Sequence, residues 1–297
     1  DLKFEIVRAY WAAVTAREAV RVLEESAARA EAELTDARQR FKVGLIPPNE
    51  VSSLEAQRSR ELAQFYEARN IRESALIDLR RLIGLPHDAV VELADALEAP
   101  STALQGEVSG LVHQALESRP ERRALSFRLD GLQERQHAAS RANLPTINLA
   151  GGVDYARPNS KIFPRKPEWQ ETWDLGVTIN WNFVDFGRTK AQVAEAEAAA
   201  KATRERLAEF DTVVTADVRQ RLLDLDSAQA QVKAVTDAVT SATEARRVVG
   251  NRFAAGVATS TDVLVAQVAM LEVELVRTRA LASVRLAEAR LERVLGR

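Results

Sequence analysis

The stretch Arg40-Phe41-Lys42-Val43-Gly44-Leu45 decides the fold, because the chain repeats it 212 positions later (252 − 40) as Arg252-Phe253-Ala254-Ala255-Gly256-Val257. Without a gap, the same offset pairs Gly84 with Gly296. Each copy reads as a long helical pattern, a short turn and a second helical pattern that ends at a glycine. A repeat of this length indicates a duplicated structural unit rather than a short stacked module.

The composition excludes several classes of protein. The chain has 297 residues, of which 46% are hydrophobic and 28% charged, with a formal net charge of −2. These values argue against a disordered chain and give no electrostatic basis for binding nucleic acid. The absence of cysteine excludes disulfides and thiolate metal sites. No apolar run approaches the roughly 20 residues of a membrane-spanning helix.

Glycine and proline lie almost only at junctions, and this predicts very long helices. Neither residue occurs in 1–43, 49–83, 188–249 or 257–295, which are rich in good helix formers. The stretch 188–249 alone would extend about 90 Å as a helix. A helix of that length cannot bury itself in a compact globule, so it must pack lengthwise in a coiled coil or a helical barrel.

The turns between the paired helices have recognisable chemistry. Gly44 and Gly256 lie where a left-handed residue would cap a helix C-terminus. Pro47-Pro48-Asn49-Glu50 and Thr259-Ser260-Thr261-Asp262 then supply proline, capping side chains and acids for the next helix start. The sequence therefore predicts two antiparallel helical hairpins with short turns.

After Pro145 the period of the hydrophobic pattern changes to 2, which predicts one β-hairpin. Apolar residues alternate with polar or small ones over 147–155 and again over 173–183, on either side of a polar, proline-containing loop. Each run has about the length of a tilted transmembrane strand, ~9–11 residues. An amphipathic hairpin packed on a soluble core is the alternative. The long flanking helices favour lipid as the cover, because they leave no compact core beside the hairpin.

One hairpin cannot close a barrel, and an open sheet edge in lipid leaves backbone groups unpaired. The remaining strands must come from other subunits or from a further hairpin. The duplication predicts such a hairpin upstream of Asp1. Because the chain starts at Asp1 and its only methionine is Met270, we expect a processed or truncated product.

Further motifs follow in a distinctive order along the chain. They are Asn49-Glu50-Val51, Arg119-Pro120-Glu121, Leu144-Pro145-Thr146-Ile147, Phe183-Val184-Asp185-Phe186-Gly187-Arg188 and Thr261-Asp262-Val263-Leu264. With the duplicated Arg-Phe-x-x-Gly turns, this order resembles the TolC-like outer-membrane factors over essentially the whole chain. Each motif alone is weak, and the specificity lies in their order and in the duplication.

The resemblance implies a trimeric exit duct of a Gram-negative efflux pump or type I secretion system. In that family each protomer adds two β-hairpins to a shared outer-membrane β-barrel, and its long helices form an α-barrel in the periplasm. The expected partners are two further copies, a periplasmic adaptor protein, an inner-membrane transporter and outer-membrane lipid. The resemblance implies transport without chemistry, so we expect no cofactor and no enzyme activity.

On this basis we expect four segments. Residues 1–86 form the helical hairpin of the first repeat, and 87–143 form a connector and a helix of the equatorial region. Residues 144–186 form the transmembrane-type β-hairpin, and 187–297 form the helical hairpin of the second repeat. A helix should resume near Leu104 or Val108 and continue, with a break at Arg119-Pro120-Glu121, to about Ala142.

Three sets of residues are candidates for function. The resemblance assigns adaptor docking to the helix-turn tips at Arg40, Phe41, Val43, Gly44, Leu45, Arg252, Phe253, Gly256 and Val257. It assigns an acidic constriction to Glu50 and Asp262, and an aromatic belt at the membrane surface to Tyr155, Trp173, Trp181, Phe183 and Phe186. Each set also has a purely structural interpretation. The glycines, arginines and acids suit helix ends, and the aromatic residues could form a hairpin core.

Two other function classes stay open at this point. A soluble coiled-coil scaffold would use the β-hairpin only as a cap. An adaptor-like periplasmic protein would also have long helical hairpins, although the Gly- and Val-rich domains of an adaptor are missing. An enzyme is the weakest alternative, since no catalytic triad, carboxylate pair or phosphate loop is recognisable. The histidines, such as His113 and His137, have no metal-ligand spacing.

Overall fold

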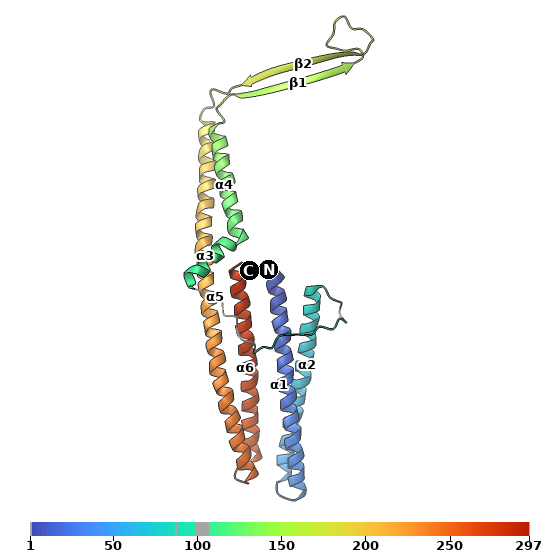
Figure 1. Cartoon of the computed structure of the whole chain (residues 1–297), viewed down its shortest axis with the longest axis vertical. Coiled ribbons are helices and arrows are strands. Elements are labelled where there is room, and N and C mark those ends of the chain that lie inside the picture. Colours follow the sequence, from blue (N-terminus) through green and yellow to red (C-terminus); the bar gives the residue numbers. More distant parts are fainter. Residues whose placement is uncertain (1, 87, 99–106, 297) are drawn as a thin grey trace. The chain divides into compact units, whose positions relative to one another are not determined.

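A computed structural model describes residues 2–86, 88–98 and 107–296, and it consists of six helices and two strands in those ranges. The elements are α1 (Leu2–Lys42), α2 (Pro48–Ile83), α3 (Val108–Ser118), α4 (Pro120–Ser140), β1 (Thr146–Ala156), β2 (Gln170–Asn180), α5 (Arg188–Ala254) and α6 (Ser260–Val294). The chain divides into two compact units. The first contains 1–119 and 213–297, and the second contains 120–212. Helix α5 continues from one unit into the other (Figure 1).

The duplication read from the sequence is present in the helix boundaries. Helix α2 begins at Pro48 and α6 at Ser260, which are 212 positions apart (260 − 48). The glycine that follows each of these helices, Gly84 or Gly296, has a positive φ, 74° or 77°. The long helix expected over 188–249 is confirmed, since α5 has 67 residues.

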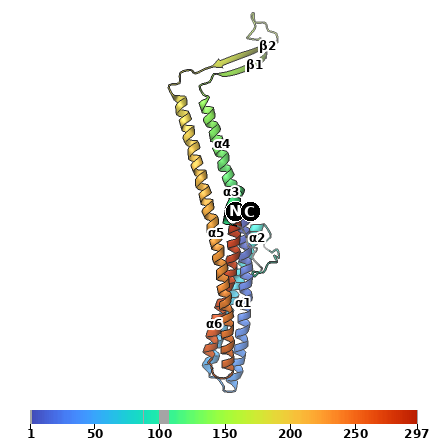
Figure 2. The ribbon, with the colours of Figure 1, turned by 60° about the vertical axis from the view of Figure 1, so that its left-hand side comes forward.

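In the first unit, α1 packs against both α2 and α6, and the core consists of small and aliphatic side chains (Figures 1 and 2). One cluster joins Val20 and Leu23 of α1 to Ala68 of α2 and Leu271 of α6. A second cluster, nearer the helix turn, joins Leu34 of α1 to Leu54 of α2. Helix α1 is therefore the seam between the hairpin of the first repeat and that of the second.

Helix α3 closes one end of this unit. It begins at Val108, one of the two positions expected, whereas Leu104 lies outside the described residues. The Ser118 hydroxyl donates to the carbonyl oxygen of Leu295 at 2.6 Å, and Arg119 Nε donates to that of Val294 at 3.0 Å. These bonds satisfy carbonyl groups that the end of a helix leaves without partners.

The second unit contains α4, the first part of α5 and the β-hairpin. Arg122 of α4 forms a two-point ion pair with Asp211 of α5, with N–O distances of 2.7 and 3.1 Å. At the other end of α4, the side chain of Asn143 accepts a hydrogen bond from Thr189 at the start of α5.

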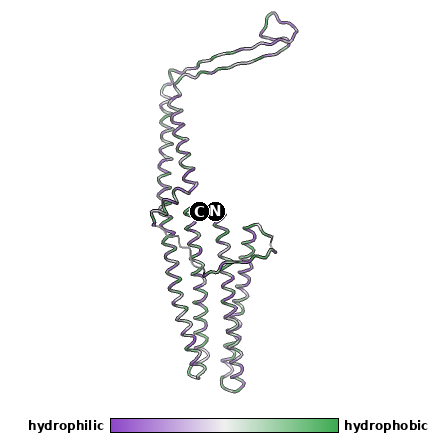
Figure 3. The backbone as a smooth tube through the Cα atoms, in the orientation of Figure 1, coloured by the Kyte–Doolittle hydropathy of each residue, from purple (hydrophilic) through white to green (hydrophobic). Residues whose placement is uncertain are grey.

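The two strands pair antiparallel over eleven residues each, from Thr146 opposite Asn180 to Ala156 opposite Gln170. Hydrophobic and hydrophilic residues alternate along them (Figure 3). The sequence-based end of the second strand was wrong: Trp181 and Phe183 lie beyond β2, which ends at Asn180. The pairing ends at Asn180 because its partner Thr146 is preceded by Pro145, which has no N–H to donate. The alternation of side chains nevertheless continues beyond that point.

Within the described ranges, no helix combines the length and the apolar character that crossing a bilayer as a helix would require.

Candidate functional site

The first helix turn is a Schellman motif built on Gly44. Its φ of 78° is left-handed, as the sequence predicted. The N–H of Gly44 donates to the carbonyl of Phe41, and the N–H of Leu45 donates to that of Arg40, both at 2.9 Å. These are the two bonds that define the motif. Glycine is required because an L side chain is strained at this φ.

The second turn repeats this geometry on Gly256, whose φ is 73°. The N–H of Gly256 donates to Phe253 at 3.0 Å, and that of Val257 donates to Arg252 at 2.9 Å. The backbone carbonyls of Arg40 and Arg252 are thus the acceptors that end their helices. The structural interpretation of the glycines is confirmed in both copies, while their docking role stays a prediction.

The apolar side chains of both turns lie on the surface. Val43 is 71% exposed, Leu45 is 74% exposed and Val257 is 66% exposed. A Cβ atom added at Gly44 or Gly256 would meet nothing within 4 Å, so the space beside each glycine is open. Exposed apolar groups gathered around an open backbone are a feature of contact surfaces. The backbone of both turns is therefore accessible from outside.

The side chain of Arg40 connects the two turns. Its guanidinium carbon lies 4.8 Å from the centre of the Phe253 ring, and its Nε lies 2.8 Å from the carboxylate of Asp36. A cation over an aromatic face is attractive by roughly 0.5–1 kcal/mol at an exposed site. Arg40 thus holds the tip of α1 against the end of α5. Phe41 is exposed on the same turn.

Beneath this contact lies a cavity of about 330 Å³ between α1 and the turn that joins α5 to α6. It is lined in part by Arg40, Phe253, Glu33 and Ser260. The Arg40–Phe253 contact therefore lies at the edge of a space that side chains do not fill.

The two acids expected at the constriction have different surroundings. Asp262 completes a capping box: its Oδ2 accepts from the backbone N–H and the hydroxyl of Thr259, both at 2.8 Å, and its own N–H donates to the Thr259 hydroxyl at 3.2 Å. The backbone bond from Thr259 is the largest of the causes that lower the pKa of Asp262. Asp262 is therefore ionised at neutral pH.

Glu50 lies in the first turn of α2, where no side chain caps the helix. The N-cap residue is Pro47, and Pro48 follows it at the first helical position. The proline and the acid expected from Pro47-Pro48-Asn49-Glu50 are thus present at the helix start, whereas the capping side chain expected from this segment was wrong. Glu50 Oε2 is buried without a hydrogen-bond partner in the described part of the chain. The acidic constriction stays a prediction for both residues.

The β-hairpin exposes its apolar face. Leu149 lies opposite Val177, and Ile147 opposite Ile179. Directly opposed residues point to the same side of a sheet, so these four side chains form one face. All four are exposed, and no residue of either strand is buried. The expectation that this face is not covered by the helices of its own subunit is confirmed.

The five expected belt aromatics are all exposed, and three of them contact another aromatic ring. Tyr155 stacks on Trp169, with ring centroids 5.1 Å apart and planes at 17°. Trp181 contacts Phe183 edge to face, and its Nε1 donates to the carbonyl of Asn143 at 3.0 Å. The sequence did not single out Trp169, because it lies in the loop just before the second alternation.

Among the residues that the structure describes, no aromatic ring pairs with either of the remaining two belt candidates. Trp173 lies on β2 opposite Val153, and Phe186 follows the hairpin with a φ of 50° and a nearly fully exposed ring.

The opposite, polar face of the hairpin carries a bridge of ion pairs that sequence reasoning missed. Lys161 Nζ lies 2.6 Å from Asp154 and 2.7 Å from Asp174.

A buried polar cluster at the α1 seam was also missed. Glu61 of α2 is 1% exposed, and its carboxylate accepts from Ser26 of α1 at 2.7 Å, from Gln57 at 2.8 Å and from Gln267 of α6 at 3.4 Å. Leu54, Gln57 and Glu61 are spaced by three and four residues, so their spacing marks them as seam positions. The residue types alone suggest a solvated face.

A second set of polar contacts crosses the same seam. Glu33 of α1 lies 3.5 Å from Arg246 of α5, and Arg29 of α1 lies 3.3 Å from Glu274 of α6. Burial raises the pKa of Glu33, partly offset by the nearby Arg246. The two repeats are therefore joined by ion pairs as well as by apolar packing.

Comparisons with known proteins agree with this geometry. Residues 111–297 match the family model described as outer membrane efflux protein. The chain is 25% identical to the outer membrane protein TolC of Vibrio cholerae over 265 residues, covering 89% of this chain and 60% of TolC. It is also 25% identical to the outer membrane efflux protein BepC of Brucella suis, covering 93% of this chain and 59% of BepC. The chain thus spans about three fifths of the length of these relatives.

Among solved structures, the open state of the MtrE outer membrane channel of Neisseria gonorrhoeae has a TM-score of 0.80 against this chain. The match covers 99% of this chain and 66% of the MtrE chain, at 21% identity. At that identity the likeness concerns the fold. It confirms long helical hairpins with a β-hairpin as the architecture of the whole described chain.

Proposed function

Because this chain belongs to the outer membrane efflux protein family, we propose that it is part of the protomer of a passive exit duct. Membership in the family places it in the outer membrane of a Gram-negative bacterium, with its helices in the periplasm. The duct serves a tripartite efflux pump or a type I secretion system. Energy comes from an inner-membrane transporter, and this chain performs no chemistry.

The single observation that carries the proposal is the exposed apolar face of the β-hairpin. Side chains such as Leu149 and Val177 would contact water if the protein were soluble, at about 25 cal/mol for each Å² of apolar surface. Hydrocarbon is the natural cover for such a face, and the aromatic residues at the hairpin ends suit a membrane interface. A scaffold in water would leave this surface unprotected.

The hairpin must be completed by other strands, since an open edge in lipid leaves backbone groups without partners. We assign the missing strands to two further copies of the protein, in a homotrimer, and to a second hairpin of the same protomer. Tyr155, Trp173, Trp181, Phe183 and Phe186 would then form the aromatic belt of the shared barrel.

The helix turns are the docking points for a periplasmic adaptor protein. Their open glycines allow a partner helix to approach the backbone, and Val43, Leu45 and Val257 supply apolar contact. Opening of the duct then requires the two hairpins to separate at the tip, which breaks the contact between Arg40 and Phe253. We assign Glu50 and Asp262 to an acidic constriction near this opening.

The experiment replaces Gly44 and Gly256 with aspartate, singly and together, in a strain that needs the duct to export a toxic compound. The control is Gly84→Asp, because Gly84 has the same left-handed φ and the same open surroundings at the other end of α2. All three changes strain the backbone alike, but only the first two place a charge at the docking turns. We expect loss of export for the tip variants, with normal trimers, and export retained for the control.

Normal export by the double variant, present at wild-type levels, would refute the docking role. Loss of export by all of the variants, the control included, would show that strain at the helix ends is responsible and would also count against docking. Recovery of the wild-type protein in the soluble fraction without detergent would refute the duct itself.

A further inference from the structure

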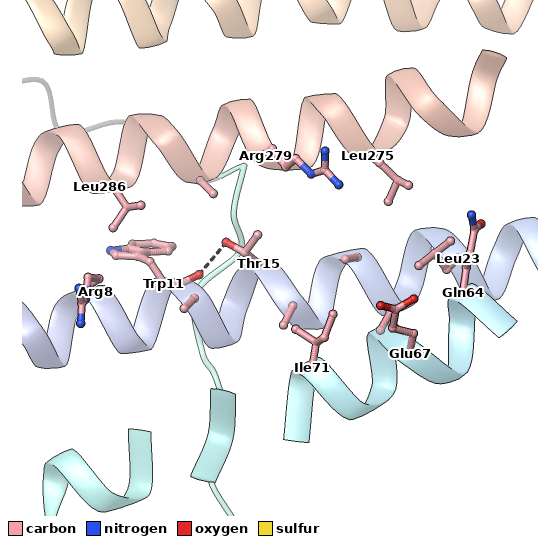
Figure 4. Close-up of a pocket in the computed structure, with 15 residues that line it drawn as sticks. Arg8, Trp11, Thr15, Leu23, Gln64, Glu67, Ile71, Leu275, Arg279 and Leu286 are labelled. Carbon is pink, nitrogen blue, oxygen red and sulfur yellow. Dashed lines mark hydrogen bonds between the residues drawn. The ribbon is translucent and has the colours of Figure 1, made fainter. Parts of the chain in front are cut away.

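A groove of about 550 Å³ runs between α1, α2 and α6, away from the helix turns (Figure 4). Its walls are largely apolar: Trp11 and Leu23 come from α1, Ile71 from α2, and Leu275 and Leu286 from α6. Figure 4 shows Trp11 and Leu286 side by side in the space between α1 and α6. The volume falls within the range of roughly 300–1,000 Å³ that is typical of sites for small ligands.

The groove exists because small residues face one another across the helices. Ala12, Ala16 and Ala19 of α1 line it opposite Ala282 of α6. Larger side chains at these positions would close the space, as the aliphatic residues of the core clusters do elsewhere along the same seam. The space between the helices is therefore not filled by side chains at this level.

The polar groups of the groove favour an anion. Arg8 and Arg279 line it, against the single carboxylate of Glu67. Arg8 is paired with Glu5 on its own helix, whereas no carboxylate in the described part of the chain pairs with the guanidinium of Arg279. The hydroxyl of Thr15 donates to the backbone carbonyl of Trp11 at 2.6 Å, so it is already satisfied (Figure 4). Arg279 is thus the group best able to orient a ligand.

The ring of Trp11 also contacts Arg285 of α6, which does not line the groove. The guanidinium carbon of Arg285 lies 5.0 Å from the ring centre, and Arg285 also pairs with Glu288 at 3.1 Å. A fixed aromatic surface requires less ordering of side chains when a ligand binds. The apolar wall of the groove is therefore preformed.

We propose that this groove binds a single-chain amphiphilic carboxylate of the fatty-acid type. Its apolar chain lies over Trp11, Leu275 and Leu286, and its carboxylate binds the guanidinium of Arg279. A carboxylate suits this group because its two oxygens can accept two parallel hydrogen bonds from a guanidinium. Such a ligand contacts α1 of the first repeat and α6 of the second, so its binding stabilises the packing of one repeat on the other. The inference does not depend on transport.

The test uses laurate with a photoreactive group at the end of its chain, incubated with the whole protein in lipid nanodiscs. Labelled peptides are identified by mass spectrometry. The matched probe is lauryl alcohol with the same photoreactive group, which has the chain but not the charge. We expect laurate to label the peptides that contain Trp11 and Leu286, and excess unlabelled laurate to abolish this labelling.

Two variants examine the two halves of the site. Arg279→Gln removes the anion-binding group and should weaken laurate about tenfold or more, as expected for a hydrogen bond to a charged group, while lauryl alcohol is unchanged. Its control is Arg290→Gln, an exposed arginine of the same helix that does not line the groove. Ala282→Leu should fill the groove and abolish labelling by both probes.

Three results would overturn the proposal. Labelling spread over all helices, or unaffected by Ala282→Leu, would place the probe outside the groove. Equal weakening by Arg279→Gln and Arg290→Gln would reduce the effect to overall charge. Displacement of the probe by phospholipid but not by laurate would make a two-chain lipid the occupant.

Discussion

Replacing Gly296 with alanine should destabilise the protein far more than the same change at Gly84, although the two glycines are equivalent in the duplication. Both follow the second helix of a repeat, and both have a left-handed φ, 77° and 74°. Alanine at such a φ costs about 1–2 kcal/mol. That strain is the whole expected cost at Gly84, because a Cβ atom there meets nothing within 4 Å.

At Gly296 the added Cβ atom would collide with α3. It would lie 2.6 Å from the Oγ of Ser118 and 3.1 Å from its Cβ. The hydroxyl cannot move away without giving up its bond to the carbonyl of Leu295. Overpacking of this kind costs typically about 1–3 kcal/mol. We therefore expect Gly296→Ala to cost about 2–5 kcal/mol in total, against about 1–2 kcal/mol for Gly84→Ala.

The assay is urea unfolding followed by the helical circular dichroism signal, with Ser118→Ala as the second member of a double-mutant cycle. Ser118→Ala removes the nearest atom, so Gly296→Ala in that background should cost little more than Gly84→Ala. The cycle isolates the contact because each single change leaves the other residue in place. Equal costs at the two glycines, or an unchanged cost at Gly296 without the Ser118 hydroxyl, would refute the steric reasoning.

Three further predictions concern the helices and their joints. Burial raises the pKa of Glu33, so the contribution of Glu33 to stability falls as the pH rises from about 4.3, the pKa of an unperturbed glutamate, through its pKa in the folded protein. Glu33→Gln should therefore flatten the dependence of the urea midpoint on pH over this range. An equally steep dependence in the variant would show that Glu33 is not the titrating group. Thr259→Ala removes the capping box and should cost about 0.5–2 kcal/mol, whereas Thr261→Ala, the control on the same turn, should cost less in the same unfolding assay. Arg122→Lys replaces a two-point ion pair with Asp211 by a single contact, which should cost up to about 1 kcal/mol of stability. The variant should also speed amide hydrogen exchange in α4. Unchanged exchange would show that the ion pair does not stabilise this helix.

Features that depend on local backbone conformation could be predicted from the sequence. The Schellman turns at Gly44 and Gly256 follow from glycine after a long helical run. Most of the length of α5 follows from the absence of glycine and proline over 188–249, and the helix continues through Gly250 to Ala254. The alternation of apolar residues gave both strands and the exposed face. The end of β2 was placed too late, since alternation describes the side chains and not the hydrogen-bond partners that Pro145 limits.

Features that depend on which helix faces which were decided only by tertiary structure. Nothing in the sequence brings Arg40 to Phe253, Lys161 to both Asp154 and Asp174, or Glu61 to donors on three helices. A polar residue at a seam position looks like a solvated one until its neighbours are known. Local geometry is encoded within a few residues, but the partner of a buried polar group is set by the packing of segments that lie more than two hundred positions apart, as Glu61 and Gln267 do.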